Sequence, residues 1–334
     1  MDSAPPSTAG PRQVVALATA ASCALGLVAV GMAALPGGGN TRDAAILHGF
    51  TSLYRRRVDT ELEAIARVVD VVPYAVGGML CIAAALVRRC GWRALAVGIV
   101  LAGTGLTTQA LKHLLAEARY TPWLGFDQIQ GASWPSGHAT AAMALALCAV
   151  IAAPPRLRTA IALAAGGATV CVSYATLALL WHYPSDALAG LLVAGLWVSL
   201  VQVVLARLED DTPPMRLRAP PPALLGLGGA GALAAAAVVG LAADRPTLYS
   251  GERVTVVAGA LTIAAVVLGL LVATVTADSE PAGRERRAAS PRPPSQPTAS
   301  VEGDRTSRAG HAHAEHADTP PRRTPAHGRS PRAP

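Results

Sequence analysis

The stretch SWPSGHATAAMALALCAVIAA, Ser133–Ala153, places a short polar motif directly before an apolar run. The run from Ala139 onward is too short to cross a membrane by itself, because a helix needs roughly 20 apolar residues to span about 30 Å of hydrocarbon. It reaches that length only if Ser136 to His138 begin the helix. The stretch therefore predicts a membrane-spanning helix whose polar motif lies at a membrane surface.

The composition indicates that the rest of the chain is also embedded in a membrane. Of the 334 residues, 52% are hydrophobic and only 15% are charged, which excludes an ordinary soluble domain of this length. The apolar residues form eight long runs, at Val14–Leu35, Val71–Val87, Ala94–Leu111, Ala139–Ala153, Ile161–Trp181, Ala187–Leu205, Ala223–Ala243 and Val254–Thr276. We therefore expect an all-α, polytopic membrane helical bundle that binds no nucleic acid.

These runs divide the chain into five parts. The predicted parts are a cytoplasmic leader (1–12), a six-span membrane domain (13–207), a linker (208–222), an additional two-span hairpin (223–277) and a disordered cytoplasmic tail (278–334). The tail is rich in Pro, Arg, Ser and Ala and cannot bury enough apolar surface to fold. Its histidines could bind a transition metal, but no second ligand group supports this, so a solvated tail is favoured over a metal site at His311, His313 and His316.

The placement of arginines predicts the orientation of the spans. The loops after the second, fourth and sixth spans carry Arg88, Arg89, Arg93, Arg156, Arg158, Arg207, Arg216 and Arg218. In the first opposite loop, three arginines are offset by Asp59, Glu61, Glu63 and Asp70. We therefore expect a multi-pass protein of the cytoplasmic membrane, with both termini in the cytoplasm and the polar motif at the extracytoplasmic face.

Two segments leave alternatives open. The first run could be a cleaved signal, but it is long and Arg12 is the one positive charge before it, so a retained span is favoured. Residues 49–70 place Leu62, Ile65 and Val69 at helical spacing beside charged residues, which predicts an amphipathic helix at the outer interface. Such a helix could shape the access of lipids to a site, or it could simply connect two spans.

Ionisable and polar groups gather at the predicted outer ends of the third to sixth spans. They are Lys112 and Arg119 after the third span, Ser136, Gly137 and His138 at the start of the fourth, and His182 and Asp186 at the start of the sixth. Charged groups are costly within a membrane, so their clustering at one face indicates function. We therefore expect the candidate functional groups to lie together at one membrane surface.

Each group has a role that suits a phosphate. Lys112 and Arg119 supply positive charge, and Gly137 lets the first amides of a helix approach an anion. Asp186 can hold one nitrogen of His182 protonated, which leaves the other nitrogen free to attack phosphorus. Taken singly, each group also has a structural explanation, as an interfacial side chain or as a helix cap. The prediction of a phosphate site therefore rests on the presence of all these groups together.

The order and spacing of KX6R, PSGH and HX3D resemble the type-2 phosphatidic acid phosphatase family of membrane lipid phosphatases, which is related to bacterial acid phosphatases and vanadium haloperoxidases. The resemblance covers about residues 48–205. It implies a phosphatase-like six-span core and phosphoryl transfer without metal or cofactor. In this chemistry His182 forms a phosphohistidine, Asp186 orients His182, and His138 protonates the leaving oxygen. The phosphoryl oxygens would be held by Lys112, Arg119, Ser136 and the Gly137 amide.

Two positions depart from the family pattern. Tyr120 stands where the family has a proline after the first-motif arginine, and Ala175-Thr176 stands where the third motif has Ser-Arg. A phosphate-binding arginine is therefore missing, and Thr176 could donate one neutral hydrogen bond instead. The loss of one donor to transition-state charge costs on the order of 10²- to 10³-fold in rate, whereas the nucleophile remains. We expect an altered but working site.

The leading hypothesis is an integral-membrane phosphatase that hydrolyses a phosphatidate-type or polyprenyl phosphate or diphosphate at the extracytoplasmic face. A lipid phosphate substrate is the partner that the sequence indicates. Two alternatives stay open: a phosphoryl transferase with an acceptor other than water, and a catalytically impaired family member that acts as a membrane scaffold or transporter. A transporter would be expected to carry charges near the middle of the membrane, and the predicted spans contain none there.

Overall fold

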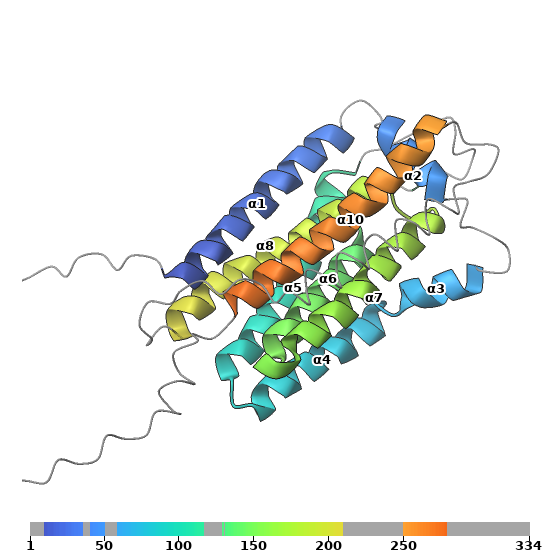
Figure 1. Ribbon diagram of the computed structural model, residues 1–334. Coiled ribbons are helices and arrows are strands. Elements are labelled where there is room, and N and C mark those ends of the chain that lie inside the picture. Colours follow the sequence, from blue (N-terminus) through green and yellow to red (C-terminus); the bar gives the residue numbers. More distant parts are fainter. Residues whose placement is uncertain are drawn as a thin grey trace, which may run out of the picture. The chain divides into compact units, whose positions relative to one another are not determined.

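Helices form the regular structure of the described part of the chain (Figure 1). The computed structural model describes residues 10–35, 41–50, 59–116, 129, 131–209 and 250–278. The helices are α1 (Pro11–Ala34), α2 (Thr41–Phe50), α3 (Asp59–Arg67), α4 (Val71–Val87), α5 (Gly91–Leu114), α6 (Gly137–Ala152), α7 (Arg158–Ala178), α8 (Pro184–Glu209) and α10 (Ser250–Ala277). Short 3-10 helices at Gly131–Ser133 and Pro155–Leu157 precede α6 and α7.

The long helices match the predicted spans. Five of them, α1, α5, α7, α8 and α10, are long and apolar enough to cross a membrane, and α3 with α4 passes the same test as a pair bent by 43°. The shorter α6 begins at Gly137, inside the polar motif as predicted, but its 16 residues fall short of the length of a full span. The prediction of an all-α polytopic membrane protein is confirmed. The predicted run at Ala223–Ala243 and the tail from residue 279 lie outside the described residues.

The segment between the first two spans contains two short helices. α3 begins with Asp59 and Glu61 and ends with Arg67, charges that complement the two ends of a helix dipole. This helix is part of the amphipathic helix predicted over residues 49–70. The sequence did not indicate α2, which packs against α7, α8 and α10. An element from outside the motifs therefore lies on the ends of two motif-bearing helices.

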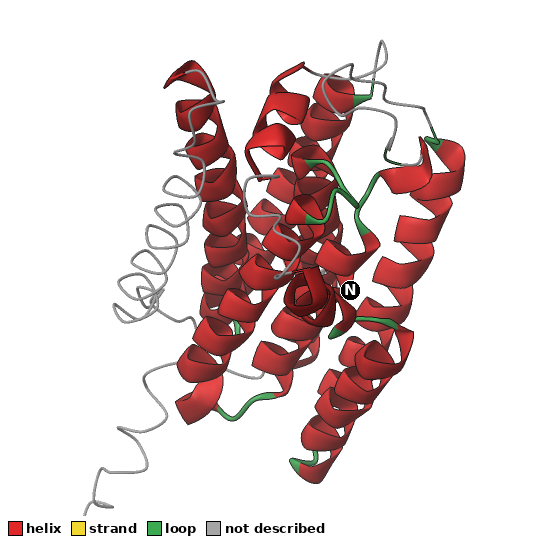
Figure 2. Cartoon of the chain, turned by 90° about the vertical axis from the view of Figure 1, so that its right-hand side faces the viewer, coloured by secondary structure: helices red, strands yellow, loops and turns green. Residues whose placement is uncertain are grey.

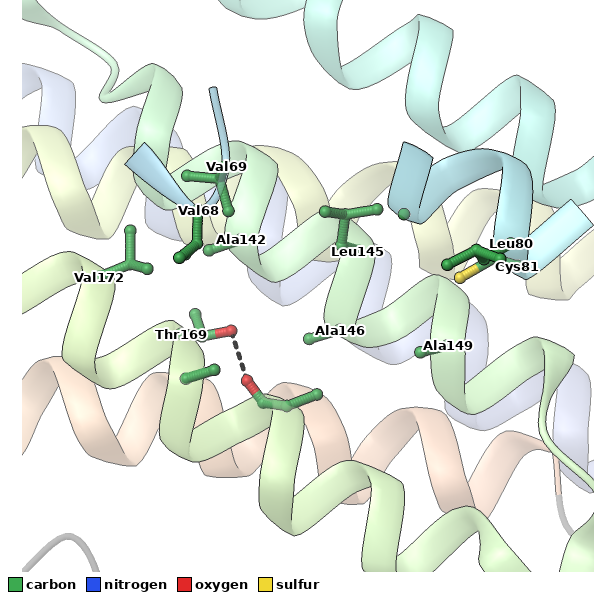
Figure 3. A pocket seen from close by; sticks show the side chains of 13 residues that line it. Val68, Val69, Leu80, Cys81, Ala142, Leu145, Ala146, Ala149, Thr169 and Val172 are labelled. Atoms are coloured by element: carbon green, nitrogen blue, oxygen red, sulfur yellow. Dashed lines mark hydrogen bonds between the residues drawn. The ribbon is translucent and has the colours of Figure 1, made fainter. Parts of the chain in front are cut away.

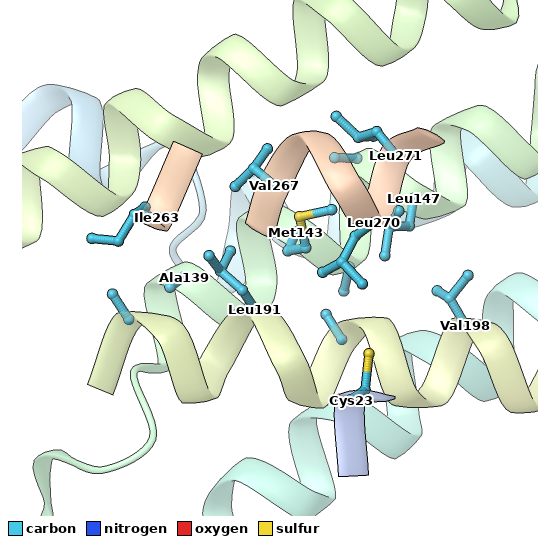
Figure 4. Packing of buried hydrophobic residues seen from close by; sticks show 14 of the residues in the cluster. Cys23, Ala139, Met143, Leu147, Leu191, Val198, Ile263, Val267, Leu270 and Leu271 are labelled. Carbon is cyan, nitrogen blue, oxygen red and sulfur yellow. The ribbon is translucent and has the colours of Figure 1, made fainter. Parts of the chain in front are cut away.

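The centre of the bundle is α6, which is apolar on all sides. Such a helix is stable when other helices surround it, and α6 packs against α4, α5, α7, α8 and α10. Met143 and Leu147 of α6 are fully buried. They share one hydrophobic cluster with Leu191 of α8 and Leu270 of α10 (Figure 4). This packing fixes the polar motif at the N-terminus of α6.

The last helix, α10, belongs to the same core. A Cβ atom on Gly166 of α7 would lie 2.5 Å from the Leu271 side chain, and a Cβ on Gly195 of α8 would lie 2.5 Å from Leu270. Glycine at these two positions therefore permits the close approach of α10. The hairpin predicted over residues 223–277 contributes at least its second helix to the packing of the motif-bearing helices.

A buried ion cluster joins the helix ends near the C-terminus of α6. The Asp278 carboxylate lies 2.9 Å from Arg93, 2.9 Å from Arg158 and 3.6 Å from Arg12. These residues come from the ends of α10, α5, α7 and α1, and Figure 2 shows the described helices in red and the described loops in green. Burial raises the pKa of the Asp278 carboxyl, and the charges of the three arginines oppose that rise. One carboxylate thus links four helices at the end opposite to the polar motif.

Candidate active site

The second motif forms the N-terminus of α6. Ser136 is the N-cap, and its Oγ accepts the Ala139 amide at 3.3 Å. The Thr140 hydroxyl donates to the Ser136 carbonyl at 2.7 Å, and the Trp134–Pro135 peptide before the cap is cis. A capped helix start with Gly137 as its first residue presents free amides and the positive end of the helix dipole. This arrangement suits an anion.

The third motif follows a tight reversal at the end of α7. The Trp181 amide donates to the Thr176 carbonyl at 2.9 Å, and the Leu180 amide donates to the Leu177 carbonyl at 3.0 Å, the two bonds of a Schellman motif. Leu180 has a φ of 58°, in the left-handed region that favours glycine. The chain therefore holds a strained residue two positions before His182, and the reversal brings His182 to the start of α8.

His182 and Asp186 form a buried pair. The Nδ1 atom of His182 lies 3.4 Å from Asp186 Oδ2, and within the described residues this buried nitrogen makes no hydrogen bond. Asp186 is 0% exposed, and its Oδ2 accepts the Tyr183 amide at 3.0 Å. The backbone thus fixes the carboxylate opposite one imidazole nitrogen. This geometry suits a protonated Nδ1, with Nε2 as the nitrogen that is free to react.

The second and third motifs touch each other directly. The Ser136 amide donates to the Asp186 carbonyl at 2.9 Å. A Cβ on Gly190 of α8 would lie 2.6 Å from the Ser136 carbonyl oxygen, so α8 and α6 can approach this closely because residue 190 is glycine. The rings of His138 and His182 have centroids 6.0 Å apart. The two histidines therefore lie close to each other at one site.

Lys112 of the first motif, on α5, lies close to the start of α6. The Nζ atom of Lys112 lies 3.9 Å from the position that a Cβ on Gly137 would occupy. The Lys112 ammonium group thus lies beside the first turn of α6. An anion bound there could contact both the ammonium group and the helix amides. Arg119, the second cation of the first motif, lies outside the described residues.

Thr176 does not present its hydroxyl hydrogen to the pocket. The hydroxyl donates to the Ser173 carbonyl within α7 at 2.9 Å, and the residue is fully buried. A threonine hydroxyl has one hydrogen, so this bond uses the donor that was expected to replace the missing arginine. The expected role of Thr176 as a phosphate donor does not fit this geometry.

Two carboxylates that sequence reasoning did not assign to the site contact the motifs. The Oδ1 atom of Asp70 lies 3.5 Å from His138 Nε2. Asp43 of α2 accepts the Ser185 hydroxyl at 2.6 Å and the Ser185 amide at 3.0 Å, which fixes the residue before Asp186. No spacing in the sequence connects either carboxylate with the motifs, because both contacts join segments that are far apart along the chain.

The bundle also contains an apolar groove of about 380 Å³. Its walls are formed by residues of α4, α6 and α7 (Figure 3). Ala142, Ala146 and Ala149 contribute small side chains at helical spacing along α6, and Val68 and Val69 line the groove from the joint of α3 and α4. Ala142 is one helical turn from His138, so the groove comes within one turn of this histidine along α6.

The comparison with protein families agrees with this geometry. Residues 93–209 match the profile described as the PAP2 superfamily. This segment contains most of α5 and all of α6, α7 and α8, together with Lys112, His138, His182 and Asp186. Comparisons with curated proteins and with solved structures find no match. The part of the chain that holds the converging motifs, residues 93–209, is therefore similar to the PAP2 superfamily.

Proposed function

We propose that this protein is a membrane phosphatase that hydrolyses a lipid phosphate or diphosphate through a phosphohistidine. One observation carries the proposal: His138 and His182 lie with ring centroids 6.0 Å apart, and a buried carboxylate faces His182 at 3.4 Å. Two imidazoles around one phosphorus can supply both a nucleophile and a proton donor. The similarity of residues 93–209 to the PAP2 superfamily supports the same reaction class.

In the first step, His182 Nε2 attacks phosphorus and a P–N bond forms while the P–O bond to the lipid breaks. His138 donates a proton to the leaving oxygen, so the lipid departs as a neutral alcohol, or as a monophosphate if a diphosphate was bound. Water then attacks the phosphohistidine, His138 takes up the proton of that water, and the P–N bond breaks. Inorganic phosphate leaves, and both histidines return to their starting states.

The charge on the transferred group would be stabilised by fixed donors. The Ser136 and Ala139 amides already form hydrogen bonds within the fold, so the remaining first-turn donors are the amides of Gly137 and His138. Lys112 adds a positive charge beside them. Preorganised donors of this kind stabilise transition-state charge without rearrangement.

The apolar groove supports a lipid as the substrate. Its lining is made of alanine, leucine and valine side chains with few polar atoms, and it begins one turn from His138. A phosphate held at the histidines would therefore place an attached hydrocarbon chain along α6, between α4 and α7. We propose the extracytoplasmic face for this reaction, because the opposite helix ends carry Arg12, Arg93 and Arg158.

Phosphate release by the purified protein in detergent tests the proposal. The panel contains phosphatidate, a polyprenyl phosphate and a polyprenyl diphosphate, each with wild type and with His182→Ala. We expect release from at least one substrate by wild type, none by His182→Ala, and no inhibition by EDTA. Equal release by both proteins would contradict the phosphohistidine, and no release from any lipid by wild type would favour the scaffold alternative.

A further inference from the structure

Asp70 lies beside the second motif, and hydrogen bonds fix its backbone. It stands at the break between α3 and α4, where its amide donates to the Arg67 carbonyl at 3.1 Å and its carbonyl accepts the Tyr74 amide at 2.8 Å. The Tyr74 hydroxyl in turn donates to the Leu101 carbonyl of α5 at 3.1 Å. The Asp70 backbone is therefore held by both neighbouring helices, and the first turn of α4 is attached to α5.

The Asp70 side chain is not used to cap its own helix. An aspartate at the N-cap normally accepts an amide of the first helical turn. Asp70 is the N-cap of α4, but its side chain makes no capping hydrogen bond. Its Oδ1 atom instead lies 3.5 Å from His138 Nε2. The carboxylate thus faces the histidine of another helix at the expense of its local role.

We propose that Asp70 is a positioning residue for His138, an inference that rests on the proposed phosphatase function. Asp70 holds the Nε2–H of His138, which leaves Nδ1 as the nitrogen that gives its proton to the leaving oxygen. As the P–O bond breaks, the proton moves from Nδ1 to that oxygen, and the carboxylate keeps the remaining Nε2–H in place. The site then contains two carboxylate–imidazole pairs, Asp186 with His182 for attack and Asp70 with His138 for proton transfer.

The pairing also explains why the outer segment belongs to the site. The break of 43° between α3 and α4 places Asp70 beside His138, and the same joint supplies Val68 and Val69 to the apolar groove. One bend therefore aligns the proton donor and the groove for the hydrocarbon chain.

Leaving-group dependence tests this inference, because a general acid matters for a basic leaving oxygen and hardly matters for a stable aryl oxide. Values of kcat/KM, which report only the steps up to departure of the leaving group, are measured with dioctanoyl phosphatidate and with p-nitrophenyl phosphate for wild type, Asp70→Asn, Asp70→Glu and His182→Ala. For Asp70→Asn we expect kcat/KM for phosphatidate to fall at least about ten-fold, with little change for p-nitrophenyl phosphate. Asp70→Glu, which keeps the carboxylate, should restore part of the loss.

Glu61→Gln is the matched control, because it neutralises an exposed carboxylate of α3 that, within the described residues, forms no ion pair with either histidine. It should behave as wild type with both substrates. A parallel fall with both substrates in Asp70→Asn, or no change with either, would overturn the positioning role. Inactivity of wild type towards both substrates is a different outcome, which would overturn the proposed function and this inference with it.

Discussion

At the scale of single residues, Asp186 makes three contacts, one of which joins the second motif to the third. Its carboxylate faces His182 at 3.4 Å and accepts the Tyr183 amide at 3.0 Å, while its carbonyl accepts the Ser136 amide at 2.9 Å. A change at this residue would therefore affect both the orientation of the nucleophile and the position of the α6 N-terminus. The buried environment strengthens these contacts, because little water competes for them.

Thr176 provides a prediction at the same scale. Thr176→Val keeps the shape of the side chain and removes a hydroxyl that donates within α7. We expect its turnover to stay close to wild type, because the hydroxyl hydrogen is already donated within α7. Lys112→Met, by contrast, should lose on the order of 10²-fold, as expected when a donor to transition-state charge is removed. A comparable loss in Thr176→Val would return this residue to the phosphate site.

At the scale of helices, the contact of α6 with α8 at Gly190 determines the geometry of the site. Gly190→Ala would place a Cβ 2.6 Å from the Ser136 carbonyl oxygen and 2.8 Å from Thr140 Oγ1, so the two helices must separate. We expect turnover to fall at least about ten-fold through the displacement of reacting groups. Gly105→Ala, whose new Cβ would meet nothing within 4 Å, is the matched control and should remain active. Equal activities of the two variants would show that this contact is not required.

The ion cluster at the far end predicts an effect on stability. Asp278→Ala would leave three buried or half-buried arginines without their shared carboxylate, which we expect to cost about 3 to 5 kcal/mol. Glu63→Ala removes an exposed pair with Arg67 and should cost less than about 1 kcal/mol. Thermal unfolding in detergent measures the difference. Similar melting temperatures for both variants would contradict the structural role of the cluster.

At the scale of the whole molecule, the two ends of the helical bundle carry different charges and different tasks. The motifs and Lys112 lie at one end, and Arg12, Arg93, Arg158 and Asp278 lie at the other. By the distribution of arginines, we expect the motif end to face away from the cytoplasm. This orientation determines which membrane leaflet supplies the substrate.

Cysteine labelling of intact cells tests the orientation. In a background without the five native cysteines, Ala116→Cys places a thiol near the motif end and Arg156→Cys places one near the opposite end, both at exposed positions. A membrane-impermeant maleimide should label residue 116 in intact cells and residue 156 only after the cells are opened. The reverse pattern would place the histidine pocket in the cytoplasm.

Much of the fold and part of the site could be predicted from the sequence, for physical reasons. Long apolar runs predict spans directly, because the thickness of the membrane sets the length of a span. The start of α6 inside the polar motif, at Gly137, was predicted in the same way. The contacts of Asp70 and Asp43 could not be predicted, since each depends on a bend or a short helix that carries no local signal. The direction of the Thr176 hydroxyl likewise depends on α7 itself.

The most direct test of the central claim is the identification of the phosphorylated residue during turnover. The protein is mixed with a lipid phosphate, the reaction is stopped in alkali to preserve a phosphohistidine, and the phosphorylated site is located by mass spectrometry. A phosphoryl group on His182, absent in His182→Ala, is the predicted result. A phosphoryl group on another residue, or turnover without any phosphoenzyme at His182, would contradict the account.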